Sequence, residues 1–272
     1  MGKVYFASDM HLGYPDLKQG AWREQLFVKW LNAISADADE LYLVGDVFDF
    51  WFEYHNVVPK GFVRTLGKLA QMVESGIKVH FFAGNHDSWT FGYLRDEVGL
   101  IVHDDWFETE IRGKRFYISH GDGVGPGDYT YKFIKWMFHN RIVRFLFRNV
   151  LPPDWGVWYG HKWSNSSRGK KGIEPLGYLG DDKEKIVLHS KELLKIKTYD
   201  YMVFGHRHLV VDKQIAESTR LIELGDWLTS FSYGVFDGQT FQIITNYDKI
   251  SNLAANASAP TDIEKNKTEK VF

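Results

Sequence analysis

The chain has 272 residues, of which 44% are hydrophobic and 25% are charged, a composition typical of a folded protein with a substantial core. Its formal net charge of −2 argues against a general nucleic-acid binder, because such proteins need an excess of cations to displace the counterions of the phosphate backbone. Cysteine is absent, so disulfides and thiolate metal sites are excluded, and any metal would be held by nitrogen and oxygen.

The first segment, "MGKVYFASDMHLGYPD", predicts a short buried strand that is followed at once by polar residues. Its apolar run is too short for a secretory signal peptide and ends at Asp9. Elsewhere no window approaches roughly 18 uninterrupted apolar residues, so no membrane-spanning helix is predicted. We therefore expect the protein in the cytoplasm.

Three short apolar runs and the segments between them predict alternating strands and helices. Residues 3–8, 40–45 and 78–84 have the length and composition of strands that are buried on both faces. Residues 21–34 and 61–74 carry apolar side chains at helical spacing. This order predicts parallel strands that are joined by crossover helices.

The later strands are predicted to pair as hairpins and to complete a second sheet. Residues 106–122 form one expected hairpin around Arg112-Gly113, and residues 232–247 form another around Asp237-Gly238. Residues 201–208 and 219–226 supply further strands. The fold class is therefore α/β, a sandwich of two mixed β-sheets flanked by helices.

Polar side chains that suit a metal follow five of the predicted strands, each at its C-terminal end. In open α/β sheets these ends lie at one edge, so the side chains should converge there. Any one of them fits a turn or a structural histidine equally well, but five strand ends together indicate one site. The residues are Asp9, His11, Asp46, Asn85, His86, His120, Asp122, His206 and His208.

The chemistry of this set favours two divalent ions. Imidazoles and carboxylates without sulfur suit Mn²⁺, Fe or Zn²⁺, and the set exceeds what one ion with open positions would take. A carboxylate can bridge two ions, whereas a neutral imidazole offers one nitrogen, so Asp46 at the end of a central strand is the best bridging candidate. Two such ions activate water and neutralise phosphate oxygens, which favours hydrolysis of a phosphate ester or anhydride.

The motifs "DMH", "GDVFD", "GNHD", "SHGD" and "GHRH", in this order, resemble the five signature blocks of the calcineurin-like metallophosphoesterases. The resemblance implies that His86 is a catalytic residue free of metal, which contacts phosphate or protonates the leaving group. Its neighbour Asp87 would orient the ring, while Asp49 and Asp122 would brace the ligand loops. The implied ligands are Asp9, His11, Asp46 and His208 for one metal, and Asp46, Asn85, His120 and His206 for the second.

Residues 129–153 contain five Lys or Arg, no acidic residue and many large apolar groups. Helical spacing places Arg141, Arg144 and Arg148 within one arc of roughly 60°. This pattern predicts a helix whose apolar surface, flanked by cations, rests on anionic lipid or clasps acyl chains, or else a helix buried in a larger core. The aromatic and basic residues 156–172 predict a loop that meets anionic ligand groups.

Two segments are therefore expected to differ from the rest of a single domain that spans residues 1–250. Residues 127–197, approximately, would form an inserted helical cap, because they are too long for a hairpin connection. Residues 251–272 are small, polar and charged, and they predict a disordered tail.

The long insertion after "SHGD", followed by "NSSR", narrows the resemblance to the UDP-2,3-diacylglucosamine hydrolases of lipid A biosynthesis. That resemblance implies cleavage of a pyrophosphate to UMP and 2,3-diacylglucosamine 1-phosphate, usually with Mn²⁺. It also implies peripheral contact with anionic lipid at the cytoplasmic face of the inner membrane. Arg168 stands where the family often has Lys. The implied substrate contacts are Asn85, His86, Asp128, Asn165, Arg168 and His206.

One position departs from the narrower family. Well-known members carry Arg where this chain has His86, and an imidazole can serve either as an acid or as a phosphate contact. The sequence therefore leaves open a capped metallophosphoesterase that acts on another nucleotide, phosphodiester or lipid diphosphate. A non-catalytic scaffold is the third alternative, and the complete ligand set argues against it.

Overall fold

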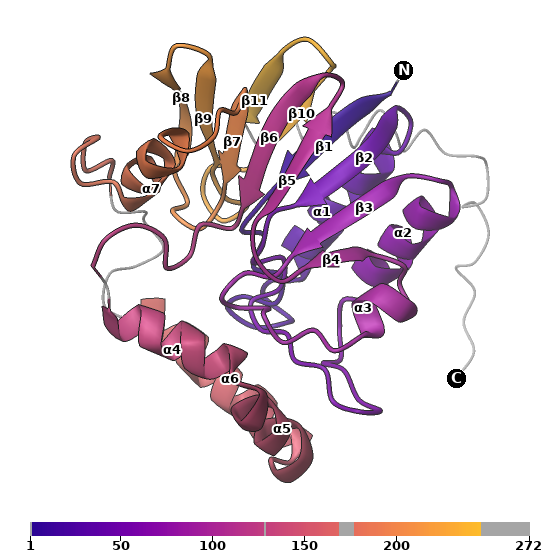
Figure 1. Cartoon of the computed structure of the whole chain (residues 1–272). Helices are drawn as coiled ribbons and strands as arrows, with labels where there is room; N and C mark the ends of the chain where they lie inside the picture. The colour runs from indigo at the N-terminus through magenta and orange to yellow at the C-terminus, as the bar shows by residue number, and fades with distance from the viewer. Residues whose placement is uncertain (1, 128, 169–176, 246–272) are drawn as a thin grey trace, which may run out of the picture.

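The computed structural model describes residues 2–127, 129–168 and 177–245 (Figure 1). The tail expected at residues 251–272 therefore lies outside the described residues. The elements, in chain order, are β1 (Lys3–Ala7), α1 (Ala21–Ile34), β2 (Ala38–Leu43), α2 (Val63–Glu74), β3 (Lys78–Phe82), α3 (Tyr93–Asp96), β4 (Ile101–His103), β5 (Phe107–Ile111), β6 (Lys114–Ser119), α4 (Tyr129–His139), α5 (Arg141–Val150), α6 (Pro153–Arg168), α7 (Lys185–Leu194), β7 (Tyr201–Phe204), β8 (Val210–Ala216), β9 (Thr219–Leu224), β10 (Ser232–Phe236) and β11 (Phe241–Thr245).

The strands form two mixed sheets. The first sheet has the order β11-β10-β1-β2-β3-β4, in which β1 to β4 are parallel and β10 runs antiparallel to both of its neighbours. The second has the order β5-β6-β7-β9-β8, with β6, β7 and β9 parallel and the two edge strands antiparallel. The predicted sandwich of two mixed sheets is therefore confirmed.

Helices cover both outer faces of the sandwich (Figure 1). On the first sheet, α1 and α2 bury one core that includes Trp30 and Leu43. A second core lies between the sheets, where the rings of Phe6 and Phe116 stack. The third core lies under α7, whose Val187 packs against the outer face of the second sheet. The central strands of both sheets are thus covered on both faces, which explains their continuous apolar runs in the sequence.

The strands and helices that have strong apolar patterns lie within a few residues of the predicted positions. The elements that the sequence prediction missed are short or exposed. The edge strand β8 alternates exposed and partly buried residues, and α3 and β4 have only four and three residues. Such elements depend on pairing with their neighbours rather than on a pattern of their own.

Three helices, α4, α5 and α6, lie together below the strand ends in Figure 1 and form the cap. The expected insertion at 127–197 also contains α7, but that helix packs on the second sheet. None of the helices that the structure describes combines the length and hydropathy of a bilayer-crossing segment.

Two expectations about the cap differ from the structure. The single helix expected across residues 129–153 is broken at Asn140, whose backbone is extended and whose side chain accepts hydrogen bonds from the first amides of α5. The segment 156–172, expected as a loop, is helical as far as Arg168. Here Gly156 and Gly160, one turn apart, let α6 approach its neighbours closely.

The expected orientation of α5 is also different. No residue of α5 is buried, so the alternative of a core helix is wrong. The guanidinium groups of Arg144 and Arg148 lie over the ring of Phe91, at 4.4 and 4.8 Å from its centroid. The cations of this helix therefore attach it to the core, while an apolar face is exposed that includes Ile142 and Phe145.

Candidate metal centre

The predicted ligands converge at the carboxyl ends of strands from both sheets. Asp9 and His11 follow β1, Asp46 follows β2, and Asn85 with His86 follows β3 in the first sheet. From the second sheet come His120 after β6, and His206 and His208 after β7. The structure brings all of the histidines and carboxylates of this set into three overlapping groups of possible metal ligands.

One group consists of Asp9, His11 and His208, whose ligand atoms all lie within 4.8 Å of one another. The Nε2 atoms of the two histidines are 3.3 Å apart, and Oδ1 of Asp9 is 3.4 Å from Nε2 of His208. The other Asp9 oxygen accepts hydrogen bonds from Ser8 and from the amide of His206. Oδ1 is buried without a hydrogen-bond partner, which is costly unless a cation lies beside it.

The second group consists of Asp46, His120 and His206. Oδ2 of Asp46 lies 3.4 Å from Nε2 of His120 and 3.8 Å from Nε2 of His11, so this oxygen faces both groups. Asn85 joins them, because its Oδ1 is 3.4 Å from Nε2 of His120. The position of Asp46 between the groups is the one that a bridging carboxylate requires.

His86 lies at the edge of these groups. It forms the third possible ligand group with His11 and Asp46, and its ring centroid is 4.8 Å from that of His11. Its Nδ1 lies 2.9 Å from the carbonyl of Asp49, a contact that requires an N–H on Nδ1. The placement fits a phosphate contact and also fits a metal ligand.

Asp87 joins two of the ligand loops. Its buried carboxylate accepts hydrogen bonds from the amides of Gly84, Asp46, Val47 and Phe48. Burial, together with the charge of Asp46, raises the pKa of Asp87 to about 7.

Other carboxylates brace the ligands and the cap. Asp49 lies 3.5 Å from Nδ1 of His11, and Asp122 accepts a hydrogen bond from Tyr131 and pairs with Lys135 at 3.0 Å. The sequence prediction missed Asp226, whose Oδ2 is 3.0 Å from Nδ1 of His208. The available signal was its position, because it too follows the end of a strand.

The charges of the cluster are strongly coupled. Although burial opposes ionisation, His208 and His11 hold the pKa of Asp9 below its usual range, and His120 and His86 do the same for Asp46. Burial opposes protonation of His120, but the Asp46 carboxylate raises its pKa to about 10. Both carboxylates are therefore ionised, and a proton on an imidazole competes with a metal ion for them.

The backbone is strained where it aims the ligands. Five non-glycine ligands adopt left-handed φ values of 43–68°, which costs on the order of 1–3 kcal/mol each and persists only where the surrounding fold enforces it. Gly84 permits a close approach of two ligand loops, since a Cβ there would lie 2.2 Å from Oδ1 of Asp46. The strained ligands are Asp9, His11, Asp46, His206 and His208.

An apolar cavity of about 410 Å³ lies beside His86 and Asn85, between the core and the cap. The core contributes Phe50, Trp51 and Trp89 to its walls. The cap contributes residues from all three of its helices, namely Tyr131, Lys135, Met137, Phe138, Phe147, Tyr159 and Gly160. A substrate at the metal centre therefore has space for an apolar group under the cap.

The structure does not describe the side chains of the three substrate contacts that the sequence predicts in the cap. Asp128 lies outside the described residues, and Asn165 and Arg168 lie in the last turns of α6, where the description does not extend to their side chains. Their contacts remain predictions.

Comparison with known proteins extends over most of the chain. Residues 2–210, which include every predicted metal ligand, match the family model described as calcineurin-like phosphoesterase. A UDP-2,3-diacylglucosamine hydrolase from Porphyromonas gingivalis is 38% identical over 250 residues, which cover 88% of this chain and 95% of that protein. Proteins of the same name from Actinobacillus succinogenes and Vibrio atlanticus are 28% and 24% identical, over 84% and 89% of this chain and 92% and 96% of theirs.

Proposed function

This chain belongs to the calcineurin-like phosphoesterase family, and on that premise we propose that it hydrolyses the pyrophosphate bond of UDP-2,3-diacylglucosamine to UMP and 2,3-diacylglucosamine 1-phosphate. The observation that carries the proposal is the apolar cavity next to the ligand cluster. A soluble nucleotide or phosphodiester has no group to fill it, whereas a diacylated sugar phosphate has two acyl chains.

The residues of the site fit two divalent cations, because an ionised carboxylate faces both ligand groups and a buried Asp9 oxygen lacks a partner. We assign Asp9, His11, Asp46 and His208 to one cation, and Asp46, Asn85, His120 and His206 to the other. Two bound cations supply Lewis acidity toward phosphate oxygens and an activated water. The nitrogen and oxygen ligands support Mn²⁺ as the native metal, with Fe and Zn²⁺ as the alternatives.

His86 is proposed to contact the phosphate rather than to act as an acid. The leaving group in pyrophosphate cleavage is itself a phosphate monoester, whose second pKa is near 6, so its departure gains little from protonation. Nδ1 of His86 is held at the Asp49 carbonyl, and the residue lies beside Asn85 at the cavity wall. Asn85 and His206 are the other proposed substrate contacts near the metals.

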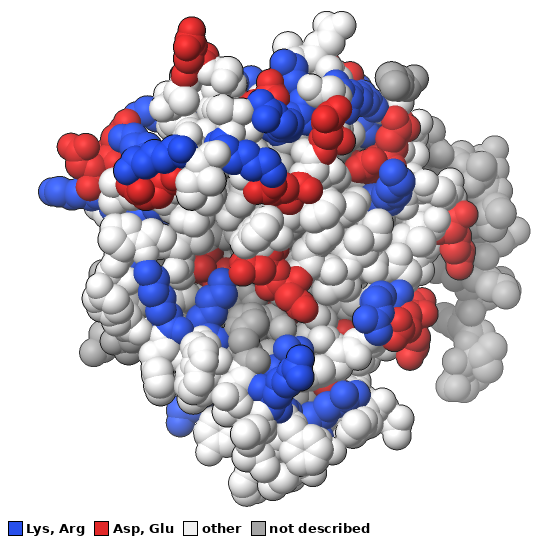
Figure 2. Space-filling view, in the orientation of Figure 1, with Lys and Arg blue, Asp and Glu red and all other residues white. Residues whose placement is uncertain are grey.

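The cap surface supports peripheral contact with an anionic membrane at the cytoplasmic face of the inner membrane. Residues 129–168 carry seven Lys or Arg and one acidic residue, of which Arg144 and Arg148 lie on Phe91 and Lys135 pairs with Asp122. In Figure 2 the lower lobe is mainly white with blue side chains. Such a surface suits insertion of apolar side chains near anionic headgroups. Its exposed apolar residues include Phe133, Trp136, Ile142, Phe145, Leu146, Val150, Trp155 and Trp158.

The proposed activity is tested with the full chain, Mn²⁺ and UDP-2,3-diacylglucosamine in detergent micelles. We expect UMP and the acylated sugar phosphate in equal amounts by mass spectrometry. Absence of UMP, with metal content and folding intact, would contradict the proposal. Faster hydrolysis of a water-soluble phosphodiester than of the acylated substrate would instead favour a capped phosphoesterase with another substrate.

Membrane contact is tested separately by flotation with vesicles that contain anionic lipid. We expect the wild type to bind and a Phe145→Glu, Leu146→Glu variant to remain unbound, while both hydrolyse a soluble phosphodiester equally. Equal binding of the two proteins would show that this face does not meet the membrane.

A further inference from the structure

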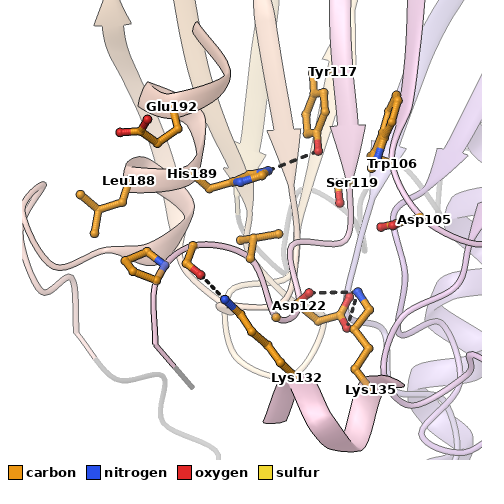
Figure 3. A pocket seen from close by; sticks show the side chains of 14 residues that line it. Asp105, Trp106, Tyr117, Ser119, Asp122, Lys132, Lys135, Leu188, His189 and Glu192 are labelled. Atoms are coloured by element: carbon orange, nitrogen blue, oxygen red, sulfur yellow. Dashed lines mark hydrogen bonds and ion pairs between the residues drawn. The ribbon is translucent and has the colours of Figure 1, made fainter. Parts of the chain in front are cut away.

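A second cavity, of about 770 Å³, lies on the outer side of the second sheet (Figure 3). Its walls are Asp105 and Trp106 before β5, the outward side chains of β6, the glycine-rich turn at 121–126, and parts of α4 and α7. Its volume is in the range of small-ligand sites. The assignments above leave this cavity without a ligand.

The two cavities meet at one ion pair. Asp122 and Lys135 line both of them, with Nζ of Lys135 3.0 Å from Oδ2 of Asp122. Asp122 is two residues beyond His120, and Ser119, on the other side of His120, lines the second cavity. A substrate that passes the Asp122–Lys135 pair, two residues beyond His120 in the chain, can therefore place one end in each cavity.

We propose that this second cavity binds the nucleotide half of the substrate, and afterwards the UMP product. The inference rests on the proposed function. The two sides of a UDP-sugar lipid differ in chemistry, because one side carries acyl chains and the other carries a base and a ribose. A strongly apolar cavity and a second cavity with a larger polar share, which adjoin at the Asp122–Lys135 pair, correspond to that division.

The upper part of the cavity suits a pyrimidine base. Trp106 is 53% exposed, and its ring is nearly parallel to that of Tyr117, with centroids 6.0 Å apart. Base stacking on an exposed aromatic ring is worth about 1–3 kcal/mol. The hydroxyl of Tyr117 lies 3.4 Å from Nε2 of His189 on α7, so hydrogen-bonding groups lie near this ring (Figure 3).

His189 and Tyr117 together supply hydrogen-bonding groups for the base. Burial lowers the pKa of His189, which favours the neutral ring. The edge of uracil presents an N–H between two carbonyl oxygens, and the phenol hydroxyl and one imidazole nitrogen are groups that can pair with it.

The lower part of the cavity suits a phosphate. Lys132 and Lys135 reach into it from α4, as Figure 3 shows, and Lys132 also donates a hydrogen bond to the carbonyl of Gly125. The walls also carry the carboxylates of Asp105, Asp122 and Glu192, so the net charge of the cavity does not select an anion, but the two ammonium groups at this end can donate to phosphate oxygens. The combination of an aromatic ring, a neutral histidine and lysines therefore indicates a nucleoside phosphate.

Calorimetric titration of the Mn²⁺-loaded full chain with UMP tests the assignment. We expect Trp106→Ala and His189→Ala to weaken UMP binding roughly 5- to 100-fold, and Trp106→Phe to keep most of it. Trp22→Ala is the matched control, because Trp22 is exposed on α1, on the other sheet, and should leave binding unchanged. Hydrolysis of bis(p-nitrophenyl) phosphate, which has no base, should stay within twofold of wild type in all four variants and so report that the fold is intact.

The possible outcomes separate this inference from the proposed function. Wild-type affinity for UMP in both alanine variants, or no UMP binding to the wild type at millimolar concentration, would overturn the cavity assignment even if the acylated substrate is cleaved. Trp106-dependent UMP binding without cleavage of that substrate would support the cavity and reject the proposed function.

Discussion

Asp46 is the residue on which both proposed metal positions depend, because one of its oxygens faces both ligand groups. We expect Asp46→Ala to lose both metals, and His120→Ala to lose at least one. His86→Ala should retain metal and lose activity by roughly 10²- to 10⁴-fold. Metal analysis of the purified variants, with hydrolysis of a soluble phosphodiester measured in parallel, checks these roles.

The matched control is His55→Ala, because His55 is an exposed histidine outside the ligand groups. This substitution should change neither the metal content nor the rate of phosphodiester hydrolysis. If His86→Ala is as depleted of metal as His120→Ala, His86 is a ligand and not a free phosphate contact.

Asp226 is expected to act through His208. Its carboxylate accepts from Nδ1 of His208 and also from the hydroxyl and amide groups of Thr229 and Ser230, so it is held in place. Asp226→Asn should weaken metal affinity by roughly 10- to 100-fold, as removal of such a partner usually does. Competition with a fluorescent chelator measures this affinity. Unchanged affinity would show that His208 needs no orienting partner.

His80 is buried far from the metal ligands and should control acid stability. Burial is the main cause that lowers the pKa of His80 to about 4, and the neighbouring His103 and Lys78 lower it further. The carboxylate of Glu40 on β2 raises this pKa and so opposes them. The pKa in the unfolded chain is near 6.5, so below pH 6.5 the unfolded state binds a proton that the folded state excludes. His80 therefore does not lower the free energy of unfolding above pH 6.5, and it lowers this free energy progressively as the pH drops from 6.5 toward 4.

We expect His80→Phe, which keeps an aromatic ring stacked on Tyr42, to remove this loss. Urea denaturation of the metal-free protein at pH 7.5 and pH 5 should show that the wild type loses about 2 kcal/mol more than the variant. Equal losses in the two proteins would mean that His80 is protonated in the folded state.

Among the elements, α6 shows how a helix with weak intrinsic propensity is held by packing. A Cβ on Gly160 would lie 2.1 Å from the ring of Phe50, and both residues line the apolar cavity. Gly160→Ala should displace this ring and raise KM for the acylated substrate roughly 10-fold, with no change for a soluble phosphodiester.

Gly67→Ala on α2 is the matched control, because a Cβ there has open space around it. Steady-state kinetics on both substrates make the comparison. An unchanged KM for the acylated substrate in Gly160→Ala would remove α6 from the acyl site.

At the scale of the whole molecule, the metal centre joins the two sheets. Four of the predicted ligands follow strands of the first sheet and three follow strands of the second, so bound metal would cross-link them. Metal at 100 times its Kd adds about 2.7 kcal/mol to the free energy of unfolding. Chelation should therefore abolish turnover and lower Tm by roughly 5 to 10 °C, a change that calorimetry can measure.

Restoration of turnover and of Tm by added Mn²⁺ would show that the effect of chelation is reversible. If Tm stays constant while metal analysis shows complete removal, the sheets do not depend on the metal.

The sequence predicted the sandwich because its central strands are buried on both faces, so that each appears as an apolar run with a polar end. It predicted the ligands for the same reason, since parallel strand ends share an edge. It did not predict the break at Asn140, because the residues around it continue a helical pattern and only the side-chain cap ends it.

What the sequence determined by itself is therefore local: the strands, the candidate ligands that follow them, and the nitrogen and oxygen chemistry that those candidates offer. Only the tertiary structure decided which face of a helix meets the core. Arg144 and Arg148 of α5, read as part of a lipid-facing border, lie on Phe91, while Ile142 and Phe145 are exposed. Periodicity gives the relative positions of residues on a helix, but its rotation depends on contacts with residues distant in the chain. The same distant contacts bring Asp226 to His208 and join two cavities at the Asp122–Lys135 pair.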